Sequence, residues 1–170
     1  MNIIAYEMKY VGGEQVPILT LVPFEDKYAD EYMQIYNECF FEMRRALDVK
    51  PYHYYQSAEQ LAERKDKIYL YLQENVIVGS FVLCDNEIDD VIVNPRFQGQ
   101  GYGKKLLYTA VAMMQERKIL PIILHVAAWN ERALRLYETN GFETTLAIKV
   151  KHDKPTRLQE LKQWFMRVFG

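Results

Sequence analysis

The sequence predicts an α/β (α+β) fold, with a mixed central sheet of about six or seven strands and helices on both faces. An N-terminal hairpin and a C-terminal amphipathic helix are expected to flank the sheet. Two observations lead to this class. Short alternating apolar segments are typical of strands, and strands alternate with helices in the second half of the chain, which implies a parallel pair. No repeat or linker interrupts the pattern, so residues 1–170 are expected to form a single domain.

The first half of the chain reads as a hairpin followed by helices. Ile4, Tyr6, Met8 and Tyr10 alternate with more polar residues, and after the two glycines at 12–13 a second strand is expected at 16–22. The remaining elements are a helix from 25 to about 47 with an apolar stripe, an aromatic loop at 50–56, and a short second helix from a capping box at 57–60 to near 66.

The second half alternates strands and helices. Strands are expected at 67–73, 76–84, 87–93, 121–127 and 144–151, and helices at about 102–117, 131–139 and from 153 onward. The strand at 121–127 is almost wholly apolar, which is typical of burial on both faces. Asn130 is expected to cap one helix, and Gly141 to end it.

Composition excludes several function classes. Cys39 and Cys84 lack metal-type spacing, and their apolar neighbours favour buried free thiols, so no metal site is expected. No signal peptide or membrane-spanning run is visible, which predicts a cytoplasmic protein without a membrane partner. The pI of about 6.0 and the lack of a basic stripe argue against a nucleic-acid partner.

A glycine-dense loop precedes the expected helix at 102–117. Three glycines in five positions let the backbone approach a ligand closely. The helix directs its unpaired N–H groups and the positive end of its dipole back into the loop. This combination predicts a phosphate-binding site.

The spacing within the loop selects among phosphate motifs. A P-loop is excluded because Gln98 stands where its first glycine is needed and Lys105 follows Lys104. The dinucleotide fingerprint fails in its glycine spacing and in the missing downstream acid. The pattern Q-x-x-G-x-G does fit. It resembles the acyl-CoA loop of the GCN5-related N-acetyltransferase (GNAT) superfamily, as do the flanking Val93-x-Pro95 and Asn130-x-x-Ala133-x-x-x-Tyr137-x-x-x-Gly141-Phe142.

This resemblance is strong over residues 76–142 and diffuse before them. It implies a GNAT-like sheet in which the strand at 87–93 splays from the strand at 121–127, and in which acetyl-CoA is the acyl donor. The Val93 N–H would polarise the thioester carbonyl. The expected acetyl-CoA contacts are Val91, Ile92, Val93, Gln98, Gly99, Gln100, Gly101, Tyr102, Gly103, Lys104, Asn130 and Tyr137.

Acetyl transfer to an amine requires an acid and a base. The resemblance implies that Tyr137 faces the CoA sulfur and acts as the acid. Glu87, eleven residues before Gln98, stands where part of the family carries a glutamate base. Strand alternation places Asp89 on the same face as Glu87 and directs Asp90 to the opposite face. Glu87 or Asp89 could therefore take the proton, directly or through a water.

The acceptor is predicted to be a primary amine, in a small molecule or a peptide. The resemblance implies that the first half of the chain supplies its contacts, and the candidates are Tyr52, Tyr54 and Tyr55 of the aromatic loop, next to His53. His125 on the neighbouring strand is a further candidate, with a structural role as the alternative.

The sequence thus predicts an acetyl-CoA-dependent N-acetyltransferase that works by direct attack in a ternary complex, because no Cys–His nucleophile is visible. A non-catalytic acyl-CoA-binding regulatory module is the alternative, and a nucleotide-binding protein a third. The tail after Lys151 departs from the family, which usually ends in a further strand. Either the N-terminal hairpin or another subunit compensates, or the tail helix packs on the sheet; a monomer or a homodimer is compatible with both.

Overall fold

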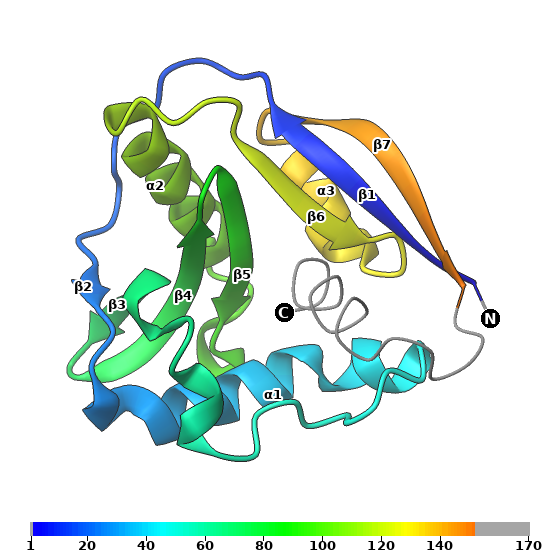
Figure 1. The fold of residues 1–170 in the computed structure, drawn as a ribbon. Helices are drawn as coiled ribbons and strands as arrows, with labels where there is room; N and C mark the ends of the chain where they lie inside the picture. The colour runs from blue at the N-terminus through cyan, green and yellow to red at the C-terminus, as the bar shows by residue number, and fades with distance from the viewer. Residues whose placement is uncertain (1, 152–170) are drawn as a thin grey trace.

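A computed structural model describes residues 2–151 as a seven-stranded mixed sheet with helices on both faces (Figure 1), which confirms the predicted class. The strand order is β2-β3-β4-β5-β6-β1-β7. The strands are β1 (Asn2–Tyr10), β2 (Val22–Pro23), β3 (Ile68–Gln73), β4 (Val76–Cys84), β5 (Glu87–Val93), β6 (Ile123–Ala127) and β7 (Phe142–Lys151). The helices are α1 (Ala29–Ala46), α2 (Tyr102–Glu116) and α3 (Glu131–Glu138). The predicted C-terminal amphipathic helix lies outside the described residues.

The predicted N-terminal hairpin is wrong. β1 does not pair with residues 16–22 but lies between β6 and β7 and is antiparallel to both. The connection after β1 instead runs along α2, where the N–H groups of Ile18 and Leu19 donate to Thr109 Oγ1. Alternation identified β1 correctly, but its partners follow more than a hundred residues later. The N-terminal strand is therefore the one that extends the sheet beyond β6.

The short second helix predicted near residues 57–66 is also wrong in type. The structure has two separate 3₁₀ turns, at Ala58–Leu61 and Lys65–Lys67. The capping box is present, since Ser57 and Gln60 cap each other's backbone groups. The cap thus starts a helical turn, and too few inward apolar side chains follow it to extend the turn into an α-helix.

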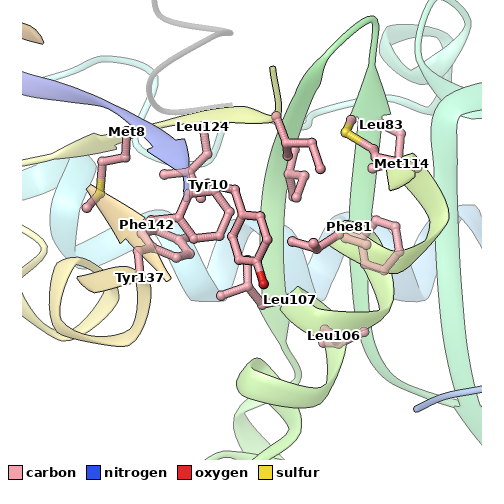
Figure 2. Packing of buried hydrophobic residues seen from close by; sticks show 14 of the residues in the cluster. Met8, Tyr10, Phe81, Leu83, Leu106, Leu107, Met114, Leu124, Tyr137 and Phe142 are labelled. Carbon is pink, nitrogen blue, oxygen red and sulfur yellow. The ribbon is translucent and has the colours of Figure 1, made fainter. Parts of the chain in front are cut away.

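Two layers of core cover the two faces of the sheet. On one face, α2 and α3 bury a cluster that includes Leu106, Tyr137 and Phe142 (Figure 2). On the other face, α1 buries Tyr32 and Tyr36 against β3, β4 and β5. All three helices bury an apolar stripe, because side chains three and four residues apart share one helix face.

The sheet opens between its two parallel neighbours, β5 and β6. They pair at one position only, Glu87 opposite Ile123, and diverge beyond it (Figure 1). The splay implied by the resemblance is therefore present. Its effect is to leave one backbone edge of β5 without a strand partner past Glu87, and this edge borders the site described next.

Candidate active site

A cavity of about 920 Å³ lies at the opening of the sheet. It is bounded by β5, the glycine loop, and the start of α3, with α1 contributing Cys39 and Phe40. The residues that line it include most of the expected acetyl-CoA contacts: Val91, Ile92, Val93, Gln98, Gly99, Gly101, Tyr102, Gly103, Lys104, Asn130 and Tyr137. Gln100 does not line it. The sequence therefore identified segments that lie far apart in the chain and meet at one cavity.

The glycine loop leaves open space toward the cavity. Gly99 and Gly101 have φ angles of +77° and +86°, which L side chains rarely adopt. A Cβ at either position would meet no protein atom within 4 Å, so local packing does not explain the glycines. α2 begins directly after Gly101, and its first N–H groups face this loop. Lys104, Arg132 and Arg135 add positive charge to the cavity wall, which suits a polyanion.

The free edge of β5 faces the same cavity. The Asn94 N–H donates to the Val78 carbonyl on β4 at 2.8 Å. Because successive N–H groups of a strand point to opposite edges, the Val93 N–H points toward the opening. The Val93 carbonyl accepts from two side chains, Gln98 Nε2 at 3.0 Å and Cys39 Sγ at 3.2 Å. The strand end is thus held by side chains and leaves room for an extended ligand.

Tyr137 is fixed in the cavity wall by the fold of α3. Asn130 caps that helix, since its side chain accepts from the Ala133 N–H at 3.1 Å. Tyr137 is buried and packs edge-on against Phe142, with ring centroids 6.0 Å apart. Burial raises the pKa of Tyr137 above its ordinary value, and the charges of Asp89 and Asp90 raise it further. The phenol therefore stays protonated, which is the form that an acid requires.

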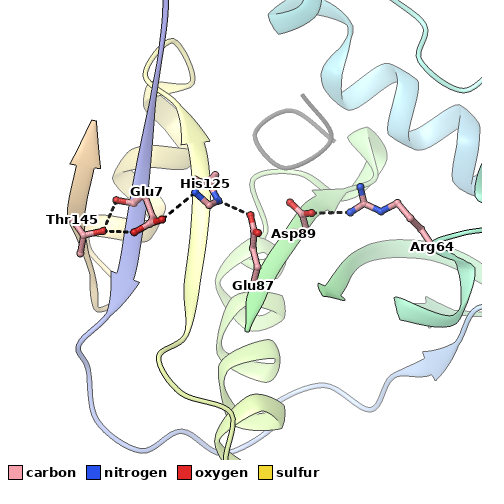
Figure 3. Close-up of polar contacts among 6 residues, drawn as sticks. All are labelled: Glu7, Arg64, Glu87, Asp89, His125 and Thr145. Atoms are coloured by element: carbon pink, nitrogen blue, oxygen red, sulfur yellow. Dashed lines mark hydrogen bonds and ion pairs between the residues drawn. The ribbon is translucent and has the colours of Figure 1, made fainter. Parts of the chain in front are cut away.

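Glu87 and His125 form a hydrogen-bonded pair across the start of the opening (Figure 3). Glu87 Oε1 lies 2.6 Å from His125 Nδ1, and His125 Nε2 lies 3.4 Å from Glu7 Oε2 on β1. Thr145 on β7 donates to Glu7 Oε1 at 3.0 Å. Burial opposes a charge on His125, but the hydrogen bond and charge of Glu87, aided by Glu7, raise the pKa of His125. Glu7 belongs to none of the sequence motifs, and only the pairing of β1 with β6 shows that it lies beside His125.

Asp89 and Asp90 both face Arg64, which corrects the expectation that Asp90 points to the opposite side of β5. Arg64 Nη2 lies 2.8 Å from Asp89 Oδ2 and 3.2 Å from Asp90 Oδ2. The cause is a register shift against β4 between Ser80 and Val82, where Asp90 adopts a φ of +47°. Such a bulge breaks the alternation on which the expectation depended. Burial raises the pKa of Asp89 well above its ordinary value, and the charge of Asp90 raises it further while Arg64 opposes.

The aromatic loop lies beside α1 and contributes no side chain to the cavity lining. Tyr55 is buried, with its ring 4.7 Å from that of Tyr36. Tyr54 packs against both of these rings. The Tyr52 hydroxyl donates to Asp48 Oδ1 at 2.7 Å. An acceptor role for the three loop tyrosines therefore stays a prediction. Cavity residues that the motifs did not point to are Cys39, Phe40, Phe97, Trp129, Glu131, Arg132, Arg135, Leu136 and Thr139.

Comparison with known proteins identifies the class to which this fold and site belong. The chain belongs to the acetyltransferase (GNAT) family, whose family model matches residues 29–142. It is an acetyltransferase by this membership and by its relatives. One relative is the [ribosomal protein bS18]-alanine N-acetyltransferase of Haemophilus ducreyi, 31% identical over 129 residues that cover 71% of this chain and 85% of the relative.

Solved structures share the fold. A GNAT-family acetyltransferase from Novosphingobium aromaticivorans superposes with a TM-score of 0.61 at 20% identity, over 88% of this chain and 63% of that one. The PaiA N-acetyltransferase of Thermoplasma acidophilum, solved in complex with coenzyme A, gives a TM-score of 0.61 at 16% identity, over 73% and 89%. This chain thus matches just under two thirds of the first structure's length. Within residues 2–151, helices are too short or too polar to cross a membrane.

Proposed function

We propose that the protein transfers the acetyl group of acetyl-CoA to a primary amine by direct attack in a ternary complex. One observation carries the proposal: a single cavity joins the glycine loop, the unpaired edge of β5 and the Tyr137 side chain. These three features are, in order, a seat for phosphates, a partner for an extended arm, and a hydroxyl for a leaving thiolate. A nucleotide-binding protein would need only the first.

Acetyl-CoA would lie along the cavity from the glycine loop to the end of β5. Its pyrophosphate would rest on the N–H groups at the start of α2, with Lys104 nearby. Its pantetheine arm would pair with the free edge of β5, where Val91 and Val93 line the cavity. The Val93 N–H would stabilise the oxyanion that forms on attack. Gln100, which does not line the cavity, is proposed as a contact only through its backbone in the loop.

The proton movements define the roles of the side chains. An acceptor ammonium must lose one proton before its nitrogen can attack the thioester carbon. Glu87 or Asp89 is proposed to take that proton. The C–S bond then breaks, and Tyr137 is proposed to donate a proton to the departing thiolate.

Cys39 supports direct attack and not a covalent intermediate. It lines the cavity, where its thiol donates to the Val93 carbonyl. Burial is the main reason that the pKa of Cys39 is raised to about 12. The charge of Glu38 also raises this pKa, and the hydrogen bond to the Val93 carbonyl opposes the rise. A thiol with this pKa is not ionised at neutral pH and is a poor nucleophile.

The acceptor is proposed to be an amine of a small molecule or a peptide N-terminus. The Haemophilus ducreyi relative is named for the alanine of ribosomal protein bS18. A peptide that begins with alanine is therefore the first acceptor to test. Tyr52, Tyr54, Tyr55 and His125 are the side chains proposed to border the acceptor, and a cytoplasmic location is proposed with them.

The experiment measures free thiol released from acetyl-CoA in the presence of different amines. The panel contains an alanine-terminated peptide, its N-terminally acetylated form as the matched control, a lysine peptide and polyamines. Release with at least one free amine, and none with the blocked peptide, is the expected result. Thermal stabilisation by acetyl-CoA without release for any amine would instead favour the regulatory module. Stabilisation by ATP or NAD alone would overturn both.

A further inference from the structure

The side chains of three strands meet in one row at the point where β5 and β6 pair, although none of these three side chains lines the cavity. Glu87 of β5 bonds to His125 of β6, and His125 also faces Glu7 of β1 (Figure 3). Building on the proposed acetyl transfer, in which Glu87 stands at the position of the family's glutamate base, we propose that Glu7 and His125 are positioning residues that hold the Glu87 carboxylate. The N-terminal strand would thus take part in the reaction, although it carries no GNAT motif.

The geometry fixes Glu87 at the point where the sheet opens. Glu87 is opposite Ile123 at the one position where β5 pairs with β6. Glu7 is opposite His125 in the pairing of β1 with β6. The side chains of Glu87 and His125 are 12% and 10% exposed, and that of Glu7 is 30% exposed. The row therefore runs from a buried carboxylate at the opening to a carboxylate that reaches solvent.

The neighbouring carboxylate, Asp89, is bound differently. It is buried and hydrogen-bonded to Arg64 at 2.8 Å, and Arg64 also pairs with Asp90. If Asp89 took this proton, it would give up part of its ion pair with a guanidinium that is only 11% exposed, which is costly. Glu87 has an imidazole as its partner instead. Of the two candidate bases, Asp89 is therefore assigned a structural role with Arg64.

The charges around His125 explain what the row contributes. The titratable groups that face the imidazole are Glu87 from β5 and Glu7 from β1, and Thr145 from β7 adds a neutral hydroxyl to Glu7. Two carboxylates favour the imidazolium, and they raise the pKa of His125 although burial opposes the charge. The imidazole therefore holds the Glu87 carboxylate on one side and is itself held by Glu7 on the other.

The proton step is balanced without any further reactant. One N–H bond of the acceptor ammonium breaks and one O–H bond forms on Glu87, through a bridging water if the amine binds beyond direct reach. No electrons are transferred. Glu87 afterwards returns the proton to solvent.

The test is the pH profile of kcat/KM for Glu7→Gln, compared with Glu143→Gln as the matched control on the exposed part of β7. Glu7→Gln should move the part of the profile that follows His125 to lower pH by about half a unit or more, because Glu7 helps to raise the pKa of His125. Glu143→Gln should leave the profile unchanged. Superimposable profiles for Glu7→Gln and the wild type would overturn the positioning role.

Two further variants separate the base from its neighbour. Glu87→Gln should lower kcat/KM about 100-fold or more while acetyl-CoA still stabilises the protein. Asp89→Asn, if it folds, should lose less activity than Glu87→Gln. The reverse order of the two would assign the base to Asp89.

A measurement without substrate keeps the inference independent of acetyl transfer. NMR titration of the His125 imidazole, assigned by comparison with His125→Asn, should show a lower pKa in Glu7→Gln than in the wild type. An unchanged His125 titration would show that the row does not couple the two residues. If Glu7→Gln lowers the pKa of His125 but the protein releases no thiol from acetyl-CoA, the coupling of the two residues is confirmed and only the proposed function is contradicted.

Discussion

The side-chain amide of Gln98 donates a hydrogen bond to the backbone carbonyl of Val93, at 3.0 Å. The same side chain accepts from Arg132 of α3 at 3.4 Å. The first residue of the glycine motif therefore touches both the end of β5 and the start of the helix that carries Tyr137. The Gln98 side chain therefore fixes the distance between the glycine loop and the end of β5. A ligand that contacts both would require such a fixed distance.

Gln98→Ala should weaken acetyl-CoA binding without unfolding the protein. The variant removes one hydrogen bond to Val93, and a typical hydrogen bond contributes about 1 kcal/mol, so the Kd should rise roughly fivefold. Calorimetry with acetyl-CoA measures it. Gln34→Ala, which removes an exposed glutamine paired with Glu38 on α1, is the control and should leave the Kd unchanged.

Gly101→Val should abolish acetyl-CoA binding. The φ of +86° at this position strains any residue with a Cβ, at a cost of roughly 1–2 kcal/mol, and the new side chain would project into the space left for the pyrophosphate. The thermal shift given by acetyl-CoA should disappear. Gly13→Val is the control, because Gly13 has neither a positive φ nor a neighbour within 4 Å of its Cβ. Retained binding in Gly101→Val would place the pyrophosphate elsewhere.

Tyr137→Phe should lower kcat about 100-fold and leave the Kd for acetyl-CoA nearly unchanged, because the phenol is proposed to act only on the departing thiolate. Steady-state kinetics and calorimetry together separate the two effects. Tyr108→Phe also removes one hydroxyl, which bonds to Asn140 and does not line the cavity. Its kcat should equal that of the wild type. Equal kcat values for both variants would remove Tyr137 as the acid.

Asp90 should make the fold less stable as the pH rises from about 4 to 6. Burial raises the pKa of Asp90 to about 6, with Arg64 opposing and Glu87 adding to the rise. Between the unfolded and folded pKa values the native state holds the extra proton, so stability falls with increasing pH, by on the order of 2 kcal/mol. Urea unfolding between pH 4 and 7 measures the slope.

Asp90→Asn should flatten this pH dependence, since an amide cannot lose the proton. Asp66→Asn, at an exposed position, should keep the wild-type slope. His125 also lowers the stability of the fold as the pH rises, over a range of higher pH than Asp90. Its raised pKa gives stability at low pH that is lost as the pH rises through the folded pKa. A slope in Asp90→Asn as steep as in the wild type would assign the proton uptake to Asp89.

The elements near the glycine loop could be predicted from sequence because their signals are local. The glycines, the cap at Asn130 and the alternation in β5 each report on a few neighbouring residues, and together they placed Gly101, Val93 and Tyr137 in segments that meet at one cavity. Spacing alone sufficed to exclude the two nucleotide motifs.

The remaining features depend on pairing between distant segments. Arg64 lies in a charged, loop-like stretch, and only its contact with β5 shows that it pairs with Asp89. The bulge at Asp90 is visible only against β4. The Glu7–His125 contact requires the register of β1 on β6. No local pattern encodes a register between segments so far apart, which is why the hairpin was expected in its place.

The position of β1 has a consequence for how the chain is made. Glu7 is opposite His125 on β6 and Leu146 on β7, so both strand partners of β1 are synthesised more than a hundred residues after it. Pairings over such separations form slowly, because the intervening loop must close first. During synthesis β1 would therefore leave the ribosome with both of its hydrogen-bonding edges unpaired until β6 and then β7 emerge.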